Sequence, residues 1–281
     1  MKIYTRRNML GVIGAASVGA LLAKPAPAGA AQPYSARVLA KKPVAYWQFG
    51  ERSGLVAHDS VNQQHNGAYK GGVALGQTGA VHSEPSTSIG LNGKDAYVEI
   101  PDSVMFSQPT SGLGLTVEAW MRPDVLTFTG ETSAHYVHWL GKGTPGAFEW
   151  GFRFYSQQSP RPNRISAYIW NAAGAEGSGA YFQDVLQPGV WIHVVACYDP
   201  GDASNPNAGV SIYRDGTLRA SPVKSPGARY AAYDIHAAHG AAPVRLGTRD
   251  LGSFLSGGLD DVAIYPRVLS AAEVLDNYRG A

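Results

Sequence analysis

Apolar and polar residues alternate along much of the chain, which is the pattern of strands that bury one face. The clearest example runs from Leu113 to Arg122. Its apolar positions, spaced by two, are Leu115, Val117, Ala119 and Met121, and the opposite positions are Thr116, Glu118 and Trp120. A second example is 147–155, where one face is expected to hold Phe148, Trp150, Phe152 and Phe154. Both segments therefore predict strands that turn one face to a hydrophobic core.

Other short apolar runs, bounded by turn residues, predict the remaining strands. They are 44–49, 86–91, 96–100, 136–140, 164–170, 191–198, 210–213, 218–223, 244–247 and 258–265. The dipeptides Asn92-Gly93 and Asp215-Gly216 are typical of hairpin turns between consecutive strands. Near the C-terminus, Ser270 and Glu273 have the spacing of a helical capping box.

These elements predict an all-β fold, a two-sheet antiparallel jelly-roll sandwich with one short C-terminal helix. Residues 34–39 are expected to add one helical turn before the first strand. The stretches 43–51 and 257–265 contain the first and last strands, and we expect them to lie near each other. The sequence has no internal repeat and no interdomain linker, so residues 31–281 are predicted to form a single domain.

Residues 1–30 have the pattern of an export signal. A twin arginine, Arg6-Arg7, precedes a modestly apolar run at 11–23, and the small-residue site Ala28-Gly29-Ala30 follows. This order predicts a twin-arginine signal peptide and an exported protein, extracellular or periplasmic. The alternative is a membrane anchor, but the apolar run is shorter than the ~20 residues that a bilayer requires.

Removal of this signal changes the charge balance. The signal holds four basic residues and no acidic one, so the formal charge of +2 becomes −2 in the mature chain. Without a basic run, the sequence indicates neither nucleic-acid binding nor attachment to an anionic membrane surface. The single cysteine, Cys197, makes no internal disulfide. The 34 glycines and 18 prolines suit a chain of many strands and turns.

Seven motifs occur in the order of a known family. They are Pro43-Val44-Ala45-Tyr46-Trp47, Asp59 with Asn66-Gly67, Val117-Glu118-Ala119-Trp120, Trp191-Ile192-His193-Val194-Val195, Tyr213-Arg214-Asp215-Gly216, Leu259-Asp260-Asp261-Val262-Ala263-Ile264-Tyr265 and Leu269-Ser270-Ala271-Ala272-Glu273-Val274. The chain thus resembles the laminin-G-like (concanavalin A-like lectin/glucanase) domains of secreted bacterial proteins, over roughly residues 36–279. The resemblance implies a curved two-sheet jelly roll, often with one bound calcium ion, that serves mostly in carbohydrate or protein recognition.

The resemblance also implies where a structural calcium ion would bind. In related domains, an aspartate of the early loop and one of the late pair bracket the ion, which points to Asp59 and Asp261. Asn62 of the same loop is a further candidate ligand, because calcium prefers carboxylate, amide and backbone oxygens. The alternative is that Asp59 and Asn62 only form turn hydrogen bonds.

A second candidate site is a sugar-binding face opposite the aliphatic and Phe-rich faces of the middle strands. Its predicted ligand-binding residues are Trp120, Glu149, Arg153, Tyr168 and Trp170. Aromatic rings stack on sugars, and charged groups bind sugar hydroxyls. Four loops, 156–163, 171–179, 200–208 and 224–243, are expected to shape the rim. The alternative is that Trp120 and Trp170 are covered by other elements, as large aromatic residues usually are.

Catalysis has less support from the sequence. Glycoside hydrolysis needs two carboxylates at a controlled separation, and no Glu-x-Asp-x-Glu run is present. We therefore predict an exported, non-catalytic, lectin-like module that binds carbohydrate or a cell-surface glycoprotein and holds a structural calcium ion. The alternative is a polysaccharide-degrading glycoside hydrolase with an atypical carboxylate pair on the concave sheet, for which Glu118 and Glu149 are the candidates.

Overall fold

The fold is described from a computed structural model of the chain. The structure describes residues 32–107, 114–170, 177–200, 209–220 and 239–281. The predicted signal at 1–30 lies outside these residues, as do large parts of three of the predicted rim loops. Within the described ranges, no helix is both long enough and apolar enough to cross a membrane.

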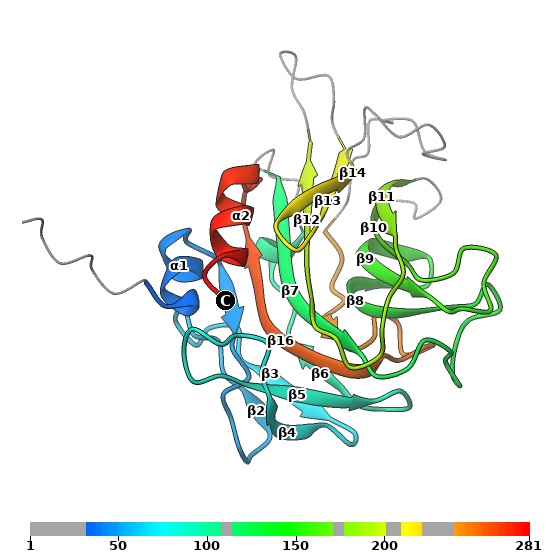
Figure 1. The fold of residues 1–281 in the computed structure, drawn as a ribbon, viewed down its shortest axis with the longest axis horizontal. Coiled ribbons are helices and arrows are strands. Elements are labelled where there is room, and N and C mark those ends of the chain that lie inside the picture. Colours follow the sequence, from blue (N-terminus) through cyan, green and yellow to red (C-terminus); the bar gives the residue numbers. More distant parts are fainter. Residues whose placement is uncertain (1–31, 108–113, 171–176, 201–208, 221–238) are drawn as a thin grey trace, which may run out of the picture. The chain divides into compact units, whose positions relative to one another are not determined.

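The described residues form two antiparallel sheets and two short helices, which confirms the predicted jelly-roll sandwich (Figure 1). Sheet A contains β1 (Ala45–Trp47), β4 (Ala74–Thr78), β5 (Thr87–Asn92), β7 (Leu115–Pro123), β12 (Ile192–Asp199), β13 (Gly209–Arg214), β14 (Thr217–Ala220) and β16 (Ser256–Tyr265). Sheet B contains β2 (Val56–Ala57), β3 (Gly67–Lys70), β6 (Tyr97–Ile100), β8 (Tyr136–Thr144), β9 (Ala147–Tyr155), β10 (Arg164–Trp170), β11 (Gly177–Gln183) and β15 (Val244–Leu246). The helices are α1 (Tyr34–Ala40) and α2 (Ala271–Tyr278), and a 3-10 turn, η1, spans Val104–Phe106.

The order of strands joins segments that are distant in the sequence. Sheet A runs β14-β13-β12-β7-β16-β5-β4, and sheet B runs β11-β10-β9-β8-β15-β6-β3-β2. The first strand, β1, pairs with the last, β16, with Ala45 opposite Ile264. The expectation that the two ends of the fold lie together is therefore confirmed.

The hydrophobic core lies between the sheets. The apolar side of β7, from Leu115 to Met121, is buried there, as its period of two predicts. Sheet B contributes Trp150, Phe152 and Phe154 from β9 to the same core. Each such side chain stabilises the fold by about 1.5–3 kcal/mol relative to an exposed position.

Phe148 is an exception to the predicted face of β9. Lys142 of β8 pairs with Trp150, whereas its neighbour Gly143 pairs with Phe148, so Glu149 is an extra residue on β9. Such a bulge reverses the alternation of side chains beyond it. Phe148 therefore packs against Trp170, on the face of sheet B that points away from the core.

One predicted hairpin is wrong and the other is confirmed. The strands on either side of Asn92-Gly93 belong to different sheets, because β5 pairs with β4 and β16 while β6 pairs with β3 and β15. This dipeptide thus carries the chain from one sheet to the other. Asp215-Gly216 does join the paired strands β13 and β14, and both residues have positive φ, 51° and 73°, as a type I′ turn requires.

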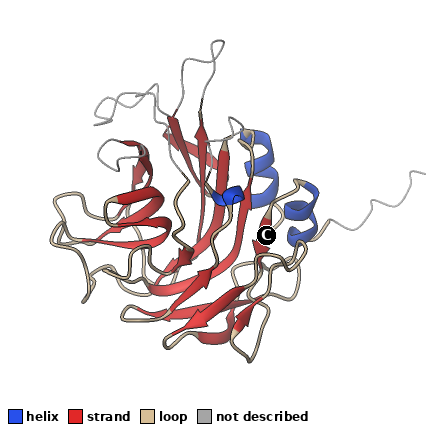
Figure 2. Ribbon diagram, turned by 180° about the vertical axis from the view of Figure 1, so that it is seen from behind, coloured by secondary structure: helices blue, strands red, loops and turns tan. Residues whose placement is uncertain are grey.

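Both helices pack on sheet A. At the start of α2, the Ser270 hydroxyl accepts the Glu273 N–H, and the Glu273 carboxylate accepts the Ser270 N–H, which is the predicted capping box. α1 is one residue longer than the predicted turn. The two helices contact each other and lie beside the same group of strands (Figure 2).

Candidate functional site

The outer face of sheet A, which points away from the core, is covered by the two helices. Tyr34 and Val38 of α1 and Val274 of α2 form a second buried cluster with side chains of β7, β12 and β16. Trp120 belongs to this cluster and is only 6% exposed, with its ring against His193 and Tyr278. Of the five residues predicted to bind a ligand, Trp120 therefore lies apart from the other four, beneath α2.

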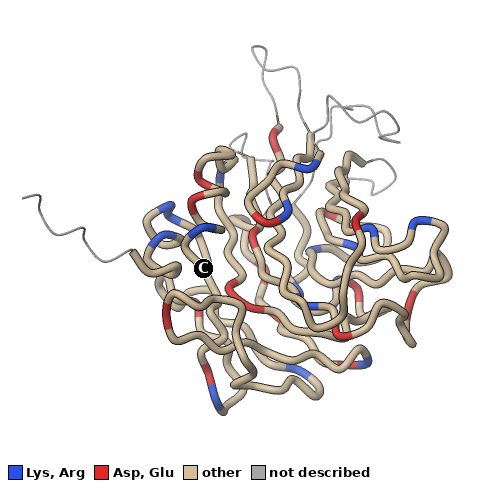
Figure 3. The backbone as a smooth tube through the Cα atoms, in the orientation of Figure 1, with Lys and Arg blue, Asp and Glu red and all other residues tan. Residues whose placement is uncertain are grey.

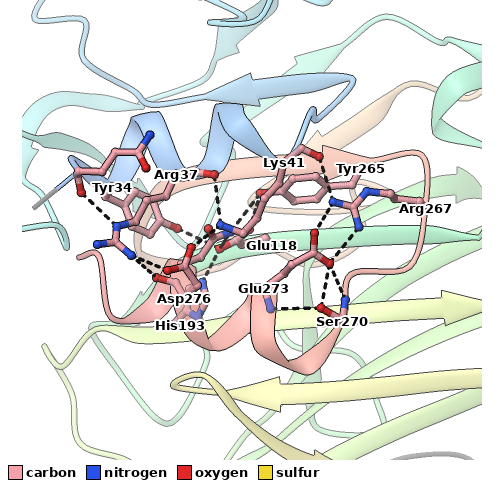
Figure 4. A network of polar contacts seen from close by, with 12 residues as sticks. Tyr34, Arg37, Lys41, Glu118, His193, Tyr265, Arg267, Ser270, Glu273 and Asp276 are labelled. Atoms are coloured by element: carbon pink, nitrogen blue, oxygen red, sulfur yellow. Dashed lines mark hydrogen bonds and ion pairs between the residues drawn. The ribbon is translucent and has the colours of Figure 1, made fainter. Parts of the chain in front are cut away.

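Glu118, two residues before Trp120 on β7, is buried at the centre of a polar network (Figure 4). Its carboxylate accepts hydrogen bonds from the hydroxyls of Tyr34 (3.1 Å) and Tyr265 (2.6 Å) and from the amide of Asn277 (2.9 Å), and it lies 2.8 Å from His193 Nε2. Burial alone would raise the pKa of Glu118, but the hydrogen bond and charge of His193, with the bonds from Tyr265 and Asn277, lower that pKa below its usual value. Glu118 thus holds both helices on sheet A.

The outer face of sheet B carries the other predicted ligand-binding residues. Here the guanidinium of Arg153 is surrounded by three rings. Its Cζ lies 4.6 Å from the ring centre of Tyr136, 4.7 Å from that of Tyr168 and 5.5 Å from that of Trp170. Arg249, from the turn after β15, stacks on Phe148 at 3.7 Å and on Trp170 at 5.0 Å. We call these six residues the arginine–aromatic cluster.

Glycines on neighbouring strands leave room for this cluster. A Cβ at Gly179 of β11 would lie 2.3 Å from the Tyr168 ring, and one at Gly177 would lie 3.0 Å from the Trp170 ring. A Cβ at Gly151 would likewise lie 3.0 Å from the Arg249 side chain. The rings and the guanidinium can therefore lie close to the sheet, and Tyr168 and Trp170 are each 9% exposed.

The carboxylate of Glu149, on β9, forms an ion pair with a buried lysine. It pairs with Lys142 and accepts the Gly240 N–H at 3.1 Å, and the residue is 2% exposed. Lys142 also lies 2.9 Å from Asp102. Glu118 and Glu149, the candidate hydrolytic pair, lie on β7 and β9, in different sheets. The two candidate carboxylates therefore do not lie on neighbouring strands of one sheet.

Three members of the cluster were not among the predicted residues. Tyr136 lies at the first position of β8. Alternation along β9 predicts Phe148 on the core side, because no feature of the sequence indicates the bulge. Arg249 had no local signal, since only the pairing of β15 with β8 brings its turn close to β9. Alternation in β9 and β10 was enough to place Arg153, Tyr168 and Trp170 together.

The loop predicted to hold calcium is tied by hydrogen bonds of its own. The buried carboxylate of Asp59 accepts the N–H groups of Tyr46 (3.1 Å), Val61 (3.0 Å) and His65 (3.4 Å). Asn62 accepts the N–H of Gln64. These are the turn contacts of the alternative interpretation. Asp261 is linked to the same region through Tyr46, whose hydroxyl donates to its carboxylate.

A cavity of about 310 Å³ lies beside Asp261. Its lining residues are Ser35, Gln48, Gly50, Arg52, Glu84, Pro85, Ser86, Thr87 and Asp261. Asp260, whose Oδ2 accepts the Ser86 hydroxyl at 3.1 Å, has a buried Oδ1 without a hydrogen-bond partner. Burial raises the pKa of Asp260 to about 7, and burial followed by the charge of Asp260 raises that of Asp261. Apart from the guanidinium of Arg52, the polar side chains that line this cavity offer oxygens, the atoms that calcium prefers.

Only Asp261 of the three predicted ligands lines this cavity. Across the ranges that the structure describes, no three or more His, Cys, Asp or Glu residues gather as a metal-binding group. An ion here would therefore use Asp261 and Glu84 together with neutral oxygens such as those of Gln48 and Ser86. Asp59 and Asn62 do not line the cavity.

Comparison with known proteins identifies the family. Residues 92–275 match the family described as the concanavalin A-like lectin/glucanases superfamily, of laminin G type. A search among curated proteins found no significant match.

Similar solved structures include binding domains of botulinum neurotoxins. The type G receptor-binding domain has a TM-score of 0.51 and 12% identity, covering 84% of this chain and 51% of that one. The serotype D binding domain has a TM-score of 0.55 and 12% identity, covering 85% and 52%. The type DC binding domain in complex with rat synaptotagmin II has a TM-score of 0.57 and 11% identity, covering 84% and 51%. The chain spans about half the length of these structures, and at such identities the likeness shows a shared fold alone.

Proposed function

The chain belongs to the concanavalin A-like lectin/glucanases superfamily, and on that premise we propose that it is a non-catalytic binding domain for carbohydrate. The ligand is a glycan, either free or carried by a cell-surface glycoprotein. One observation carries the proposal. Arg153, Tyr168 and Trp170 lie together on the outer face of sheet B, whereas the two helices cover the outer face of sheet A.

The chemistry of the arginine–aromatic cluster suits a sugar. Binding sites for small ligands combine apolar or aromatic walls with a few polar groups that fix orientation. The rings of Tyr136 and Trp170 supply the walls, and Arg153 supplies hydrogen-bond donors in a fixed planar fork. Cation–π contacts of about 0.5–2 kcal/mol each hold Arg153 in place before a ligand arrives.

The similar solved structures favour recognition as the role of this fold. Two of them are the botulinum neurotoxin DC binding domain in complex with rat synaptotagmin II and in complex with SialylT. For this chain we propose a glycan, because aromatic rings flank a cation on the outer face of sheet B.

The placement of the carboxylates supports a non-catalytic role. Glu118 is buried under α2 with four hydrogen-bonding partners, and Glu149 is paired with Lys142. A glycosidase needs one carboxylic acid to protonate the leaving group and a second carboxylate nearby. Hydrolysis of any member of a polysaccharide panel, lost in a Glu149→Gln variant, would favour the glycoside hydrolase alternative.

Glycan-array binding tests the proposal directly. We expect the wild-type protein to bind a subset of glycans and the Tyr168→Ala/Trp170→Ala double variant to lose at least tenfold in affinity. A Tyr97→Ala variant is the matched control, because Tyr97 is a partly exposed ring of β6 in the same sheet, in contact with Phe254 rather than with the cluster. A double variant that remains folded and keeps full affinity would contradict the proposal.

We also propose a structural calcium ion and an export route. The two carboxylates of the cavity beside Asp261, those of Asp261 and Glu84, support the ion, which would join β16 to the segment that contains Glu84 and Ser86. The twin arginine and small-residue site in residues 1–30 support export through the twin-arginine route. Secretion that is undiminished when Arg6 and Arg7 are both replaced by Lys would exclude that route.

A further inference from the structure

The outer face of sheet B holds a guanidinium, that of Arg153, to which no carboxylate of the described residues is paired. Among the described residues, Arg153 forms no ion pair. Its Nε donates a long hydrogen bond, 3.4 Å, to His138 Nε2, and its side chain also hydrogen-bonds with Tyr155. After burial, the strongest influences on the pKa of Arg153 are the tyrosines at 136, 155 and 168, which raise it. A half-buried cation thus lies among aromatic rings without a carboxylate partner, which is uncommon unless a ligand supplies one.

Arg249, behind Arg153, also has unused donors. Its Nη2 pairs with Asp250 at 3.0 Å, but Nε and Nη1 are buried and lack any acceptor. His138 Nδ1 is buried without a hydrogen-bond partner as well, 3.6 Å from the same Asp250 carboxylate. Buried polar groups in folded proteins are nearly always hydrogen-bonded, so three orphaned nitrogens in one place require an explanation.

The surrounding side chains add to the positive charge. Arg161 and Arg164 lie 5.1 and 5.9 Å from the ring centre of Tyr155, and neither forms an ion pair in the part of the chain that is described. Burial would raise the pKa of Tyr155, but the positive charge of Arg153, helped by Arg161 and by hydrogen bonds, lowers it below its usual value. The guanidinium groups of Arg153, Arg161 and Arg164 thus all lie against aromatic rings on this side of sheet B.

Resting on the proposed function, we infer that the glycan is acidic, and that Arg153 binds the carboxylate of a uronate or sialate unit while Arg249 supplies a second positive charge behind it. A guanidinium and a carboxylate match as two parallel N–H···O bonds, which are stronger and more directional than bonds between neutral groups. The sugar ring then lies against the aromatic wall formed by Tyr136 and Trp170. A neutral glycan would leave the charge of Arg153 uncompensated.

Binding of acidic probes, each compared with an uncharged counterpart, tests this inference by calorimetry on the full mature chain. The probes are polygalacturonate against its methyl ester, alginate against its propylene glycol ester, and sialyllactose against lactose. We expect at least one acidic probe to bind at least tenfold more tightly than its counterpart. That binding is expected to weaken with added sodium chloride, because salt screens partly exposed charges.

Variants of Arg153 test whether this residue binds the carboxylate of the glycan. Arg153→Gln is expected to lower the affinity at least tenfold, and Arg153→Lys to restore only part of it, because lysine keeps the charge but not the planar fork. The matched control is Arg219→Gln, which removes the same charge from β14, where Arg219 pairs with Asp184. Its affinity is expected to equal that of the wild type.

The outcomes separate this inference from the proposed function. If a neutral counterpart binds as tightly as its acidic probe, or if a folded Arg153→Gln variant keeps full affinity, the inference is overturned and the proposed function stands. If no acidic or neutral glycan binds, the proposed function fails with it. If the Arg153→Gln variant does not fold, the inference is tested on the wild-type protein alone, by comparing its affinity for each acidic probe with its affinity for the uncharged counterpart.

Discussion

Glu118 shows how a single buried residue joins elements that are distant in the sequence. Its carboxylate on β7 accepts hydrogen bonds from α1, α2 and β16 and lies against His193 on β12. A buried carboxylate is tolerated only where partners compensate for the lost hydration. Alternation places Glu118 on the side of β7 that points away from the core. There it is the polar centre of the face of sheet A that the two helices cover.

A Glu118→Gln variant is expected to lower the free energy of unfolding by about 3–5 kcal/mol, the usual effect of breaking a buried ionic contact. The amide would present donors to the donors of Tyr34 and Asn277. Glu99→Gln is the matched control, because its ion pair with Arg245 is 31% exposed on the Glu99 side and is expected to contribute at most about 1 kcal/mol. Urea denaturation measures both variants, and equal losses would contradict the prediction.

The buried side chain of His138 is expected to make the free energy of unfolding depend on pH. Burial, followed by the charge of Arg249, lowers its pKa from 6.5 to about 3. Between these two values the unfolded chain binds a proton that the folded chain does not, so the free energy of unfolding decreases as pH falls from 6.5 towards 3. The expected slope is up to ~1.4 kcal/mol per pH unit.

Urea denaturation at pH 7.0, 5.5 and 4.5 measures this slope. A His138→Gln variant is expected to lose less stability on acidification than the wild type, while groups present in both proteins cancel in the comparison. His58→Gln, at an exposed histidine, is the control. The same pH slope in His138→Gln and in the wild type would contradict the assignment.

Elements in this fold combine local signals with long-range demands. α2 begins at a capping box that is visible in the sequence, yet the helix matters because it covers Trp120 and Glu118. β16 shows the opposite case. Its register shifts between Asp260 and Ala263, and Asp261 has a positive φ of 47°, so the strand bends where two carboxylates are buried.

Removing the N-cap of α2 tests the local part of this argument. Ser270→Ala is expected to lower the free energy of unfolding by about 1 kcal/mol, because an N–H at the start of the helix loses its acceptor. Ser270→Asp retains an acceptor and is expected to remain close to the wild type in urea denaturation. A loss in Ser270→Asp as large as that in Ser270→Ala would show that the cap is not the cause.

On the scale of the domain formed by residues 32–281, the two outer sheet faces differ. Helices cover the outer face of sheet A, and the arginine–aromatic cluster occupies the outer face of sheet B. Acidic and basic residues are otherwise interspersed along the described backbone (Figure 3). The positive charge of the arginines on the outer face of sheet B, to which we propose that a ligand binds, is therefore local. The net charge of the whole chain is near zero.

Calcium dependence is a prediction for the whole domain. Chelation is expected to lower the thermal midpoint by a few degrees and added calcium to restore it, because a ligand that binds only the folded state stabilises it by about 2.7 kcal/mol at 100 times its Kd. Asp261→Asn is expected to abolish the shift, and Asn62→Ala to preserve it. A shift that disappears in Asn62→Ala would place the ion in the early loop, and no shift in the wild type would contradict the proposal.

Local physics explains what could be read from the residues alone. Alternation of apolar side chains depends only on the geometry of a strand, so it correctly assigned the buried side of β7 and placed Arg153, Tyr168 and Trp170 on one face. The turn at Asp215-Gly216 and the cap at Ser270 involve residues at most a few positions apart. Motif order then led to the family. The strand pattern alone led us to expect the first and last strands near each other, and the structure pairs them.

Tertiary structure decided the features that depend on contacts between distant segments. Asn92-Gly93 would be a turn both in a hairpin and in a connection between sheets, and only the pairing of β5 and β6 with other strands determines that it links two sheets. The bulge opposite Gly143 turned Phe148 outwards, and α2 covered Trp120. The pairing of β15 with β8 brought Arg249 to the cluster. Such contacts are selected by the free energy of the whole fold, so no short stretch of sequence specifies them.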